Sequence, residues 1–177
     1  MNNINSEHQR MLSVWQQHLF AEFELKSTEA AIATMTENPH VLLIPSGTGG
    51  VGQQGVRDFY ANDFIPNIPP DFELVPVSQV FAKDRIVEEL VVRFTHTLKM
   101  DWMLPALPPT DRKVQFVLVA IIQFENGKVA SEHLHWDQAT VLSQLGVLDI
   151  PVAAAGIESA VNLLDLSALE SHDRVSV

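Results

Sequence analysis

The stretch that decides the fold spans residues 132–146 and reads EHLHWDQATVLSQLG. Its first half alternates as a strand does, and its second half has the apolar spacing of a helix. Asp137 stands at the junction, where an aspartate can cap the helix, and Gly146 is placed to end it. Because side chains alternate across a strand, His133, His135 and Asp137 are predicted to point to one side of the sheet. Such a group indicates either a pocket or an ordinary strand end with a helix cap.

The residues before this stretch predict a meander of strands. Asn126-Gly127 is the residue pair most favoured in a two-residue hairpin turn, and it separates a strongly apolar run from the strand that leads into Trp136. The alternation and the turn residues predict strands over residues 41–44, 72–83, 86–101, 113–125 and 128–136.

Helical patterns dominate the first third of the chain. Leu12, Trp15, Leu19 and Phe23 recur at helical spacing, and Ser27 suits the N-cap of a second helix. We expect helices over residues 7–25, 28–35, 55–64, 138–145 and 157–170. Helices followed by antiparallel strands predict an α+β fold, in which a strongly curved, mostly antiparallel sheet packs on the N-terminal helices as a cone. The prediction is a single domain over residues 1–177, with an extra C-terminal helix at about 157–170, and the inside of the cone is a natural small-molecule cavity.

Composition excludes several classes of function. The 177 residues carry 22 acidic side chains against 11 Lys and Arg, a net charge of −11, which argues against binding nucleic acid or an anionic membrane surface. There is no cysteine, so disulfides and thiolate metal sites are excluded. No apolar run approaches the ~20 residues of a membrane helix, and the N-terminus lacks a signal-peptide pattern. The default expectation is a cytoplasmic protein with neither nucleic acid nor membrane as a partner.

Two motifs suggest a nucleotide or a metal. Residues 47–52 read GTGGVG and match G-x-G-x-x-G, but no parallel βαβ unit and no P-loop lysine accompany them, so a mobile loop or a long turn is favoured. His133 and His135 form His-x-His on a strand, and His96 could join them from a neighbouring strand as a metal ligand. Without a further placed ligand, a pair of hydrogen-bonded pocket histidines is the simpler interpretation.

Several bulky or polar residues are candidates for a pocket wall. Strand 86–101 places Phe94 and His96 on the face toward the core or cavity, where Glu88 also falls and needs a partner. Tyr60, Trp102 and Trp136 lie near strand and loop ends and are either core contacts or pocket walls. The acidic pairs at 22/24 and 88/89 are most simply solvated.

The run from Asp137 to Gly146, preceded by residues 124–133 (FENGKVASEH), resembles the C-terminal signature of SnoaL-like polyketide (ester) cyclases of the nuclear transport factor 2-like superfamily. The resemblance implies a cystatin-like or nuclear transport factor 2-like roll, usually dimeric through the sheet. It places Asp137 where the cyclases keep a general base that removes a C–H proton next to a carbonyl group. It implies no metal and no organic cofactor. The C-terminal helix, the insertion at 102–109 and the His-x-His depart from the cyclase pattern and are similar to an uncharacterised sub-branch.

These residues predict a mechanism and two alternatives. An apolar cone would raise the pKa of Asp137 by desolvation and make it a better base, while His135 or His96 could donate a hydrogen bond to the developing enolate. His133, Tyr60, Trp102, Trp136 and Phe94 are the expected contacts of a small apolar or carbonyl-containing ligand. The alternatives are a non-catalytic ligand-binding or dimerisation module of the same fold, and a metal-dependent hydrolase that uses His133 and His135.

Overall fold

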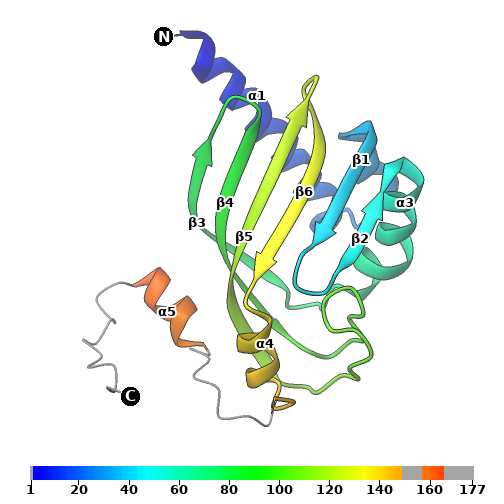
Figure 1. The fold of residues 1–177 in the computed structure, drawn as a ribbon, viewed down its shortest axis with the longest axis vertical. Helices are drawn as coiled ribbons and strands as arrows, with labels where there is room; N and C mark the ends of the chain where they lie inside the picture. Colours follow the sequence, from blue (N-terminus) through cyan, green and yellow to red (C-terminus); the bar gives the residue numbers. More distant parts are fainter. Residues whose placement is uncertain (1, 149–156, 166–177) are drawn as a thin grey trace.

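The computed structural model describes residues 2–148 and 157–165. One six-stranded sheet has the strand order β2-β1-β6-β5-β4-β3 and curves over the N-terminal helix (Figure 1). Every neighbouring pair is antiparallel except β1 and β6, which run parallel. The predicted α+β fold with a curved, mostly antiparallel sheet is confirmed. The strands are β1 (Met35–Leu43), β2 (Thr48–Val51), β3 (Glu73–Phe81), β4 (Arg85–Thr95), β5 (Lys113–Glu125) and β6 (Lys128–Trp136).

The helices lie before, between and after these strands. Helix α1 passes behind the sheet in Figure 1, and α4 follows β6 directly. Two helices continue as short π-helical segments, named η1 and η2, in which the backbone turn is one residue wider than in an α-helix. The helical segments are α1 (Asn2–Leu19), η1 (Phe20–Glu24), α2 (Thr28–Ala33), α3 (Gly52–Asp58), η2 (Phe59–Phe64), η3 (Ile65–Asn67), α4 (Gln138–Gln144) and α5 (Glu158–Leu164).

Strand β5 shows why one face of the sheet carries the core. Its buried side chains are every second residue from Val114 to Phe124, and those between them are half-buried. This period of two directs one apolar row toward the helices. The turn after β5 has positive φ at both Asn126 and Gly127, as a type I′ hairpin requires, so the predicted hairpin is confirmed.

Several predicted boundaries differ from the structure, among them the end of β4 at Thr95 rather than residue 101 and the start of β1. Strand β1 begins at Met35 and contains Pro39, although Asn38-Pro39 was expected to precede the strand. The pairing with β6 shifts register between Met35 and His40, and this irregularity accommodates a proline that cannot donate to the ladder.

The glycine-rich segment forms a turn and the strand β2 of an antiparallel hairpin, where a mobile loop or a long turn was expected. Strand β2 pairs with β1, and α3 begins at Gly52. A Cβ at Gly49 would lie 2.0 Å from the carbonyl oxygen of Val41, and Gly49 has φ +137°, so close backbone approach requires the glycine. The glycines of the motif therefore allow the backbones of β1 and β2 to approach closely in an antiparallel pair, and the motif is not part of a βαβ unit.

The C-terminal helix is described from Glu158 to Leu164, where it contacts β5. The rest of the predicted 157–170 helix beyond residue 165 lies outside the described residues. Among the helices that the structure describes, none is both long and apolar enough to cross a membrane.

Candidate active site

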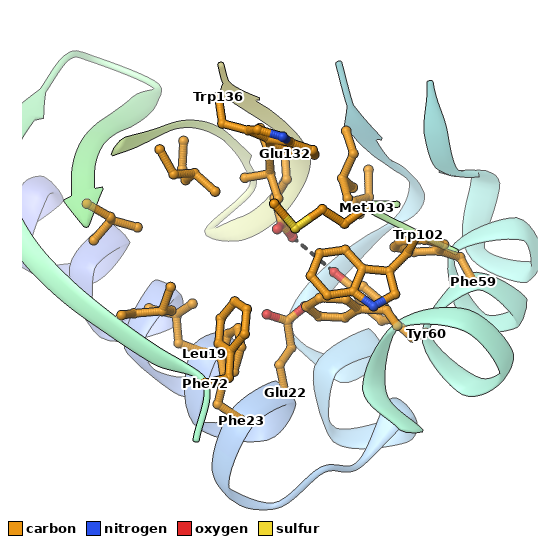
Figure 2. Close-up of a pocket in the computed structure, with 18 of the residues that line it drawn as sticks. Leu19, Glu22, Phe23, Phe59, Tyr60, Phe72, Trp102, Met103, Glu132 and Trp136 are labelled. Carbon is orange, nitrogen blue, oxygen red and sulfur yellow. Dashed lines mark hydrogen bonds between the residues drawn. The ribbon is translucent and has the colours of Figure 1, made fainter. Parts of the chain in front are cut away.

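A cavity of about 60 Å³ lies between the inner face of the sheet and the helices. Aromatic side chains dominate its wall, and they include all three tryptophans and the only tyrosine of the chain. Figure 2 shows Trp102, Trp136 and Tyr60 among them. The aromatic lining residues are Trp15, Phe23, Phe59, Tyr60, Phe64, Phe72, Trp102, Phe116 and Trp136, and the other apolar ones are Leu19, Val41, Leu43, Leu74, Leu90, Met103, Leu118, Ala120 and Leu134.

The indole N–H groups of the tryptophans are bonded elsewhere. Trp15 donates to Glu88 at 2.7 Å, Trp102 donates to the carbonyl oxygen of Asn67, and Trp136 donates to the Gln138 side chain. These three residues therefore offer the cavity ring surface without a free donor. Among the described residues that line the cavity, the remaining two, Glu22 and Glu132, carry the only charged groups.

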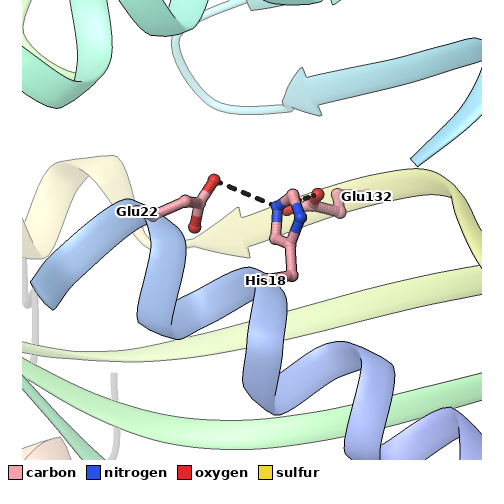
Figure 3. A group of neighbouring side chains, drawn as sticks. All are labelled: His18, Glu22 and Glu132. Carbon is pink, nitrogen blue, oxygen red and sulfur yellow. Dashed lines mark hydrogen bonds and ion pairs between the residues drawn. The ribbon is translucent and has the colours of Figure 1, made fainter. Parts of the chain in front are cut away.

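Glu22 and Glu132 belong to a buried polar cluster with His18 and Tyr60 (Figures 2 and 3). The Nε2 atom of His18 lies 3.0 Å from Glu132 Oε1, 3.2 Å from Glu22 Oε1 and 3.1 Å from the Tyr60 hydroxyl. The Tyr60 hydroxyl donates to Glu132 Oε1 at 3.2 Å. On the far side of the ring, His18 Nδ1 lies 2.6 Å from Thr34 Oγ1. All four members of the cluster are at most 3% exposed.

The cluster holds a positive charge between two carboxyl groups. Burial by itself lowers the pKa of His18, but the charges of Glu132 and Glu22 outweigh it and raise that pKa to about 10. Burial raises the pKa of Glu22, against the opposing influence of His18. Burial, with the nearby carboxylates, also raises the pKa of the Tyr60 hydroxyl well above its ordinary value. Below pH 10, His18 is therefore an imidazolium, and burial favours the protonated form of Glu22.

Local structure explains how distant residues reach one point. His18 and Glu22 are four residues apart and share one helix face, although the backbone widens to a π-helical turn at Phe20, whose carbonyl accepts from Leu25 at 2.9 Å. Tyr60 comes from the second π-helical segment, η2. Glu132 shares its strand face with Leu134 and Trp136, and all three line the cavity.

Of the ligand contacts expected from the sequence, Tyr60, Trp102 and Trp136 line the cavity. Phe94 does not. It is buried against the rings of Phe72 and Phe116, which themselves line the cavity.

The structure does not bring Asp137, His135 and His96 together in the cavity. Asp137 is exposed and caps α4, where it accepts from Ala139 N at 2.9 Å and from Thr140 Oγ1 at 2.6 Å. The hydrogen bond from Thr140 lowers the pKa of Asp137, so the expectation that desolvation raises it is wrong.

His133 and His135 do lie on one strand face, as the alternation predicts, but it is the face opposite to the cavity-lining Glu132 and Leu134. His133 Nε2 lies 2.9 Å from His40 Nε2 across the β1–β6 pair. These histidines do not line the cavity, so their expected contact with a ligand stays a prediction.

His96 follows β4 and is fully buried outside the cavity lining. Its Nδ1 lies 3.2 Å from Thr110 Oγ1, and its carbonyl accepts from the backbone of Thr110 and Asp111. It therefore anchors the loop that carries Trp102.

His18, Glu22 and Glu132 were missed as site residues. Glu22 and Glu88, one from each of the acidic pairs at 22/24 and 88/89, were expected to be solvated, and both are buried. Two signals could have found the cluster. His18 and Glu22 follow the apolar stripe of α1 at helical spacing, and Glu132 alternates with Trp136, which was itself expected to face a pocket.

The family model described as SnoaL-like polyketide cyclase matches residues 10–145. The chain belongs to the SnoaL-like polyketide cyclase family. A comparison with curated protein sequences gives no significant match.

Solved structures similar to this SnoaL-like protein share its fold. A putative SnoaL-like polyketide cyclase from Jannaschia sp. CCS1 is 17% identical, with a TM-score of 0.63 over 79% of this chain and 94% of that one. A ketosteroid isomerase-like protein from Catenulispora acidiphila DSM 44928, in complex with trimethylamine, is 12% identical, with a TM-score of 0.58 over 76% and 93%. TerC, co-crystallised with polyporic acid, is 13% identical, with a TM-score of 0.57 over 77% and 98%. At these identities the likeness concerns the fold.

Proposed function

We propose that this SnoaL-like protein is a proton-transfer enzyme of the cyclase or isomerase type that acts on a small carbonyl compound inside the aromatic cavity. The observation that carries the proposal is the buried cluster of His18, Glu22, Glu132 and Tyr60. In the part of the chain that the structure describes, this cluster supplies the only charged groups of an otherwise apolar cavity wall. Buried titratable groups with perturbed pKa values in a cavity are what acid–base chemistry needs.

The cluster offers both a base and an acid. The ionised carboxylate of the pair takes the C–H proton next to the substrate carbonyl. The protonated partner, or the Tyr60 hydroxyl, donates a hydrogen bond to the enolate oxygen that forms. His18 keeps one carboxylate ionised because its charge lies 3.0 Å from Glu132 and 3.2 Å from Glu22. In this mechanism the base is a member of the Glu22–Glu132 pair, and Asp137 serves as a helix cap.

The cavity volume limits the ligand. About 60 Å³ accommodates a few water molecules, so a larger substrate requires the wall to move. The wall segment with Trp102 and Met103 comes from a loop rather than the sheet, and the Ser46 and Thr48 side chains donate to the Trp102 carbonyl at 2.9 Å and 2.5 Å. We propose that this loop opens for the ligand.

The test detects proton removal without knowledge of the product. The protein is incubated in D₂O with a panel of small carbonyl compounds, each of which carries a C–H group next to its carbonyl group. Nuclear magnetic resonance then follows deuterium uptake next to the carbonyl group. We expect wild type to accelerate uptake for at least one compound, and Glu22→Gln/Glu132→Gln to lose roughly 100-fold or more of that rate.

The matched control is Asp137→Asn, which keeps the cap and removes the carboxylate. It should exchange at the wild-type rate. Loss of exchange in Asp137→Asn, with full exchange in the Glu22/Glu132 variant, would assign the base to Asp137 and overturn the proposed mechanism.

A second candidate function is non-catalytic binding of a small organic amine. Aromatic rings beside carboxylates form the kind of cage that recognises alkylammonium groups, and a protein of the same fold was crystallised with trimethylamine. Thermal stabilisation by trimethylammonium, with no deuterium exchange on any carbonyl compound, would favour this function over catalysis.

A further inference from the structure

The Nε2 atom of His18 is surrounded by more oxygen atoms than one ring nitrogen can serve. Three lie within 3.2 Å: Glu132 Oε1, the Tyr60 hydroxyl and Glu22 Oε1 (Figure 3 shows the two carboxyl groups). A ring nitrogen carries either one hydrogen or one lone pair, so it can satisfy one of these contacts well but not all three. Convergence of this kind is what a cation at the centre requires.

The hydrogen bonds of the His18 ring fix a hydrogen on Nδ1, so only Nε2 can either carry a hydrogen or offer its lone pair. The Thr34 hydroxyl donates its hydrogen to the carbonyl oxygen of Ala31 at 2.7 Å. Thr34 Oγ1 must then accept from His18 Nδ1, at 2.6 Å, which fixes the hydrogen on Nδ1. Metal-binding histidines are held in the same way, with the second ring nitrogen donating to a protein acceptor.

The donor atoms have the spacing of a coordination shell. Metal–ligand bonds to histidine nitrogen and carboxylate oxygen are about 2.0–2.2 Å long, so neighbouring donors in a tetrahedral or octahedral shell lie about 3.0–3.5 Å apart. His18 Nε2 lies 3.0 Å and 3.2 Å from the two carboxylate oxygens, and donor atoms of all three residues lie within 4.8 Å of one another.

We propose that His18 Nε2, Glu22 and Glu132 bind one divalent first-row transition-metal ion, with the Tyr60 hydroxyl and the cavity on its open side. One imidazole and two carboxylates suit ions such as Zn²⁺, Mn²⁺ or Fe²⁺.

The backbone is irregular where it carries the residues of the proposed metal site. His18 and Glu22 flank the start of the π-helical segment η1, and Tyr60 lies in the π-helical segment η2. Single π-helical turns are often found at functional sites, where they redirect side chains that a regular helix would direct elsewhere. This inference does not rest on proton transfer, since it concerns binding alone.

Zn²⁺ and Co²⁺ are the probes for the test. Full-length protein is stripped with a chelator, and ion binding is measured by isothermal titration calorimetry, with the visible spectrum of Co²⁺ as a second readout. We expect one ion per chain, and binding weakened at least roughly 100-fold in Glu22→Gln/Glu132→Gln. Thr34→Val, which removes the acceptor for Nδ1 together with the hydrogen bond to the Ala31 carbonyl, should weaken binding about 10- to 100-fold.

The matched control is His133→Gln, because the His40–His133 pair is a competing place for a metal ion. It should bind as wild type does, and circular dichroism checks that each variant is folded. Absence of binding by wild type, unchanged affinity in the Glu22/Glu132 variant, or loss of binding in His133→Gln would each overturn the proposal. The deuterium-exchange assay repeated with chelator present separates the two ideas, because exchange without metal binding leaves the proposed function standing.

Discussion

Glu22→Gln and Glu132→Gln, singly and together, should destabilise the protein in a strongly non-additive way. The imidazolium of His18 is fully buried and needs one counterion, and either carboxylate can serve, at 3.2 Å or 3.0 Å. Each single glutamine keeps the hydrogen-bonding shape and leaves the other carboxylate in place, so we expect a loss of about 1 kcal/mol. The double variant leaves the buried charge unpaired and should lose about 3–5 kcal/mol. The coupling between the two positions is therefore at least about 1 kcal/mol.

Urea unfolding measures these losses, with tryptophan fluorescence as the signal because all three tryptophans line the cavity next to the cluster. Glu89→Gln is the control. Glu89 lies on the same strand as buried Glu88 but accepts from Ser78 at a half-buried position, so its replacement should change stability by less than about 0.5 kcal/mol. Losses in the double variant that equal the sum of the two single losses would refute the shared-counterion reasoning.

Three further predictions concern the cap, the pH dependence and a glycine. Asp137→Ala should cost about 1 kcal/mol and lower Tm by about 2–4 °C in a thermal melt, whereas Asp137→Asn, which can still cap, should stay close to wild type. The pKa of His18 is raised from 6.5 to about 10 in the folded protein, so its stabilisation is fully present below pH 6.5 and is lost as pH rises through 10. Wild type should therefore lose more stability than His18→Gln between about pH 7 and about pH 10, and equal losses in urea midpoints would contradict this. Gly49→Ala should cost roughly 3 kcal/mol, because its Cβ would meet the Val41 carbonyl at 2.0 Å. Gly47→Ala, with nothing within 4 Å, should cost only the roughly 1 kcal/mol of its positive φ, and similar Tm losses for both would count against the packing explanation.

The fold was largely predictable because its signals are local. Strand β6 and strand β5 have the predicted bounds, since alternation and the Asn126-Gly127 turn both act between near neighbours in the chain. The N-cap of α2 at Ser27 and that of α4 at Asp137 are likewise local hydrogen bonds. The start of β1 was less predictable. The strand continues through Pro39 because it pairs with the parallel strand β6, which lies far away in the sequence.

The site was only partly predictable. The sequence by itself determined that His133, His135 and Asp137 alternate with Glu132, Leu134 and Trp136, because a strand has two faces. Which face meets the cavity depends on the side of the sheet that α1 covers, and only the tertiary structure decided that. The tertiary structure turns the strand face that carries Glu132 toward the cavity. It also places His18, Glu22 and Tyr60 beside Glu132, although they come from helices more than 70 residues away in the chain. Burial and charges at about 3 Å then shifted the pKa values of His18, Glu22 and Tyr60, because these effects act through space between residues that are distant in the sequence.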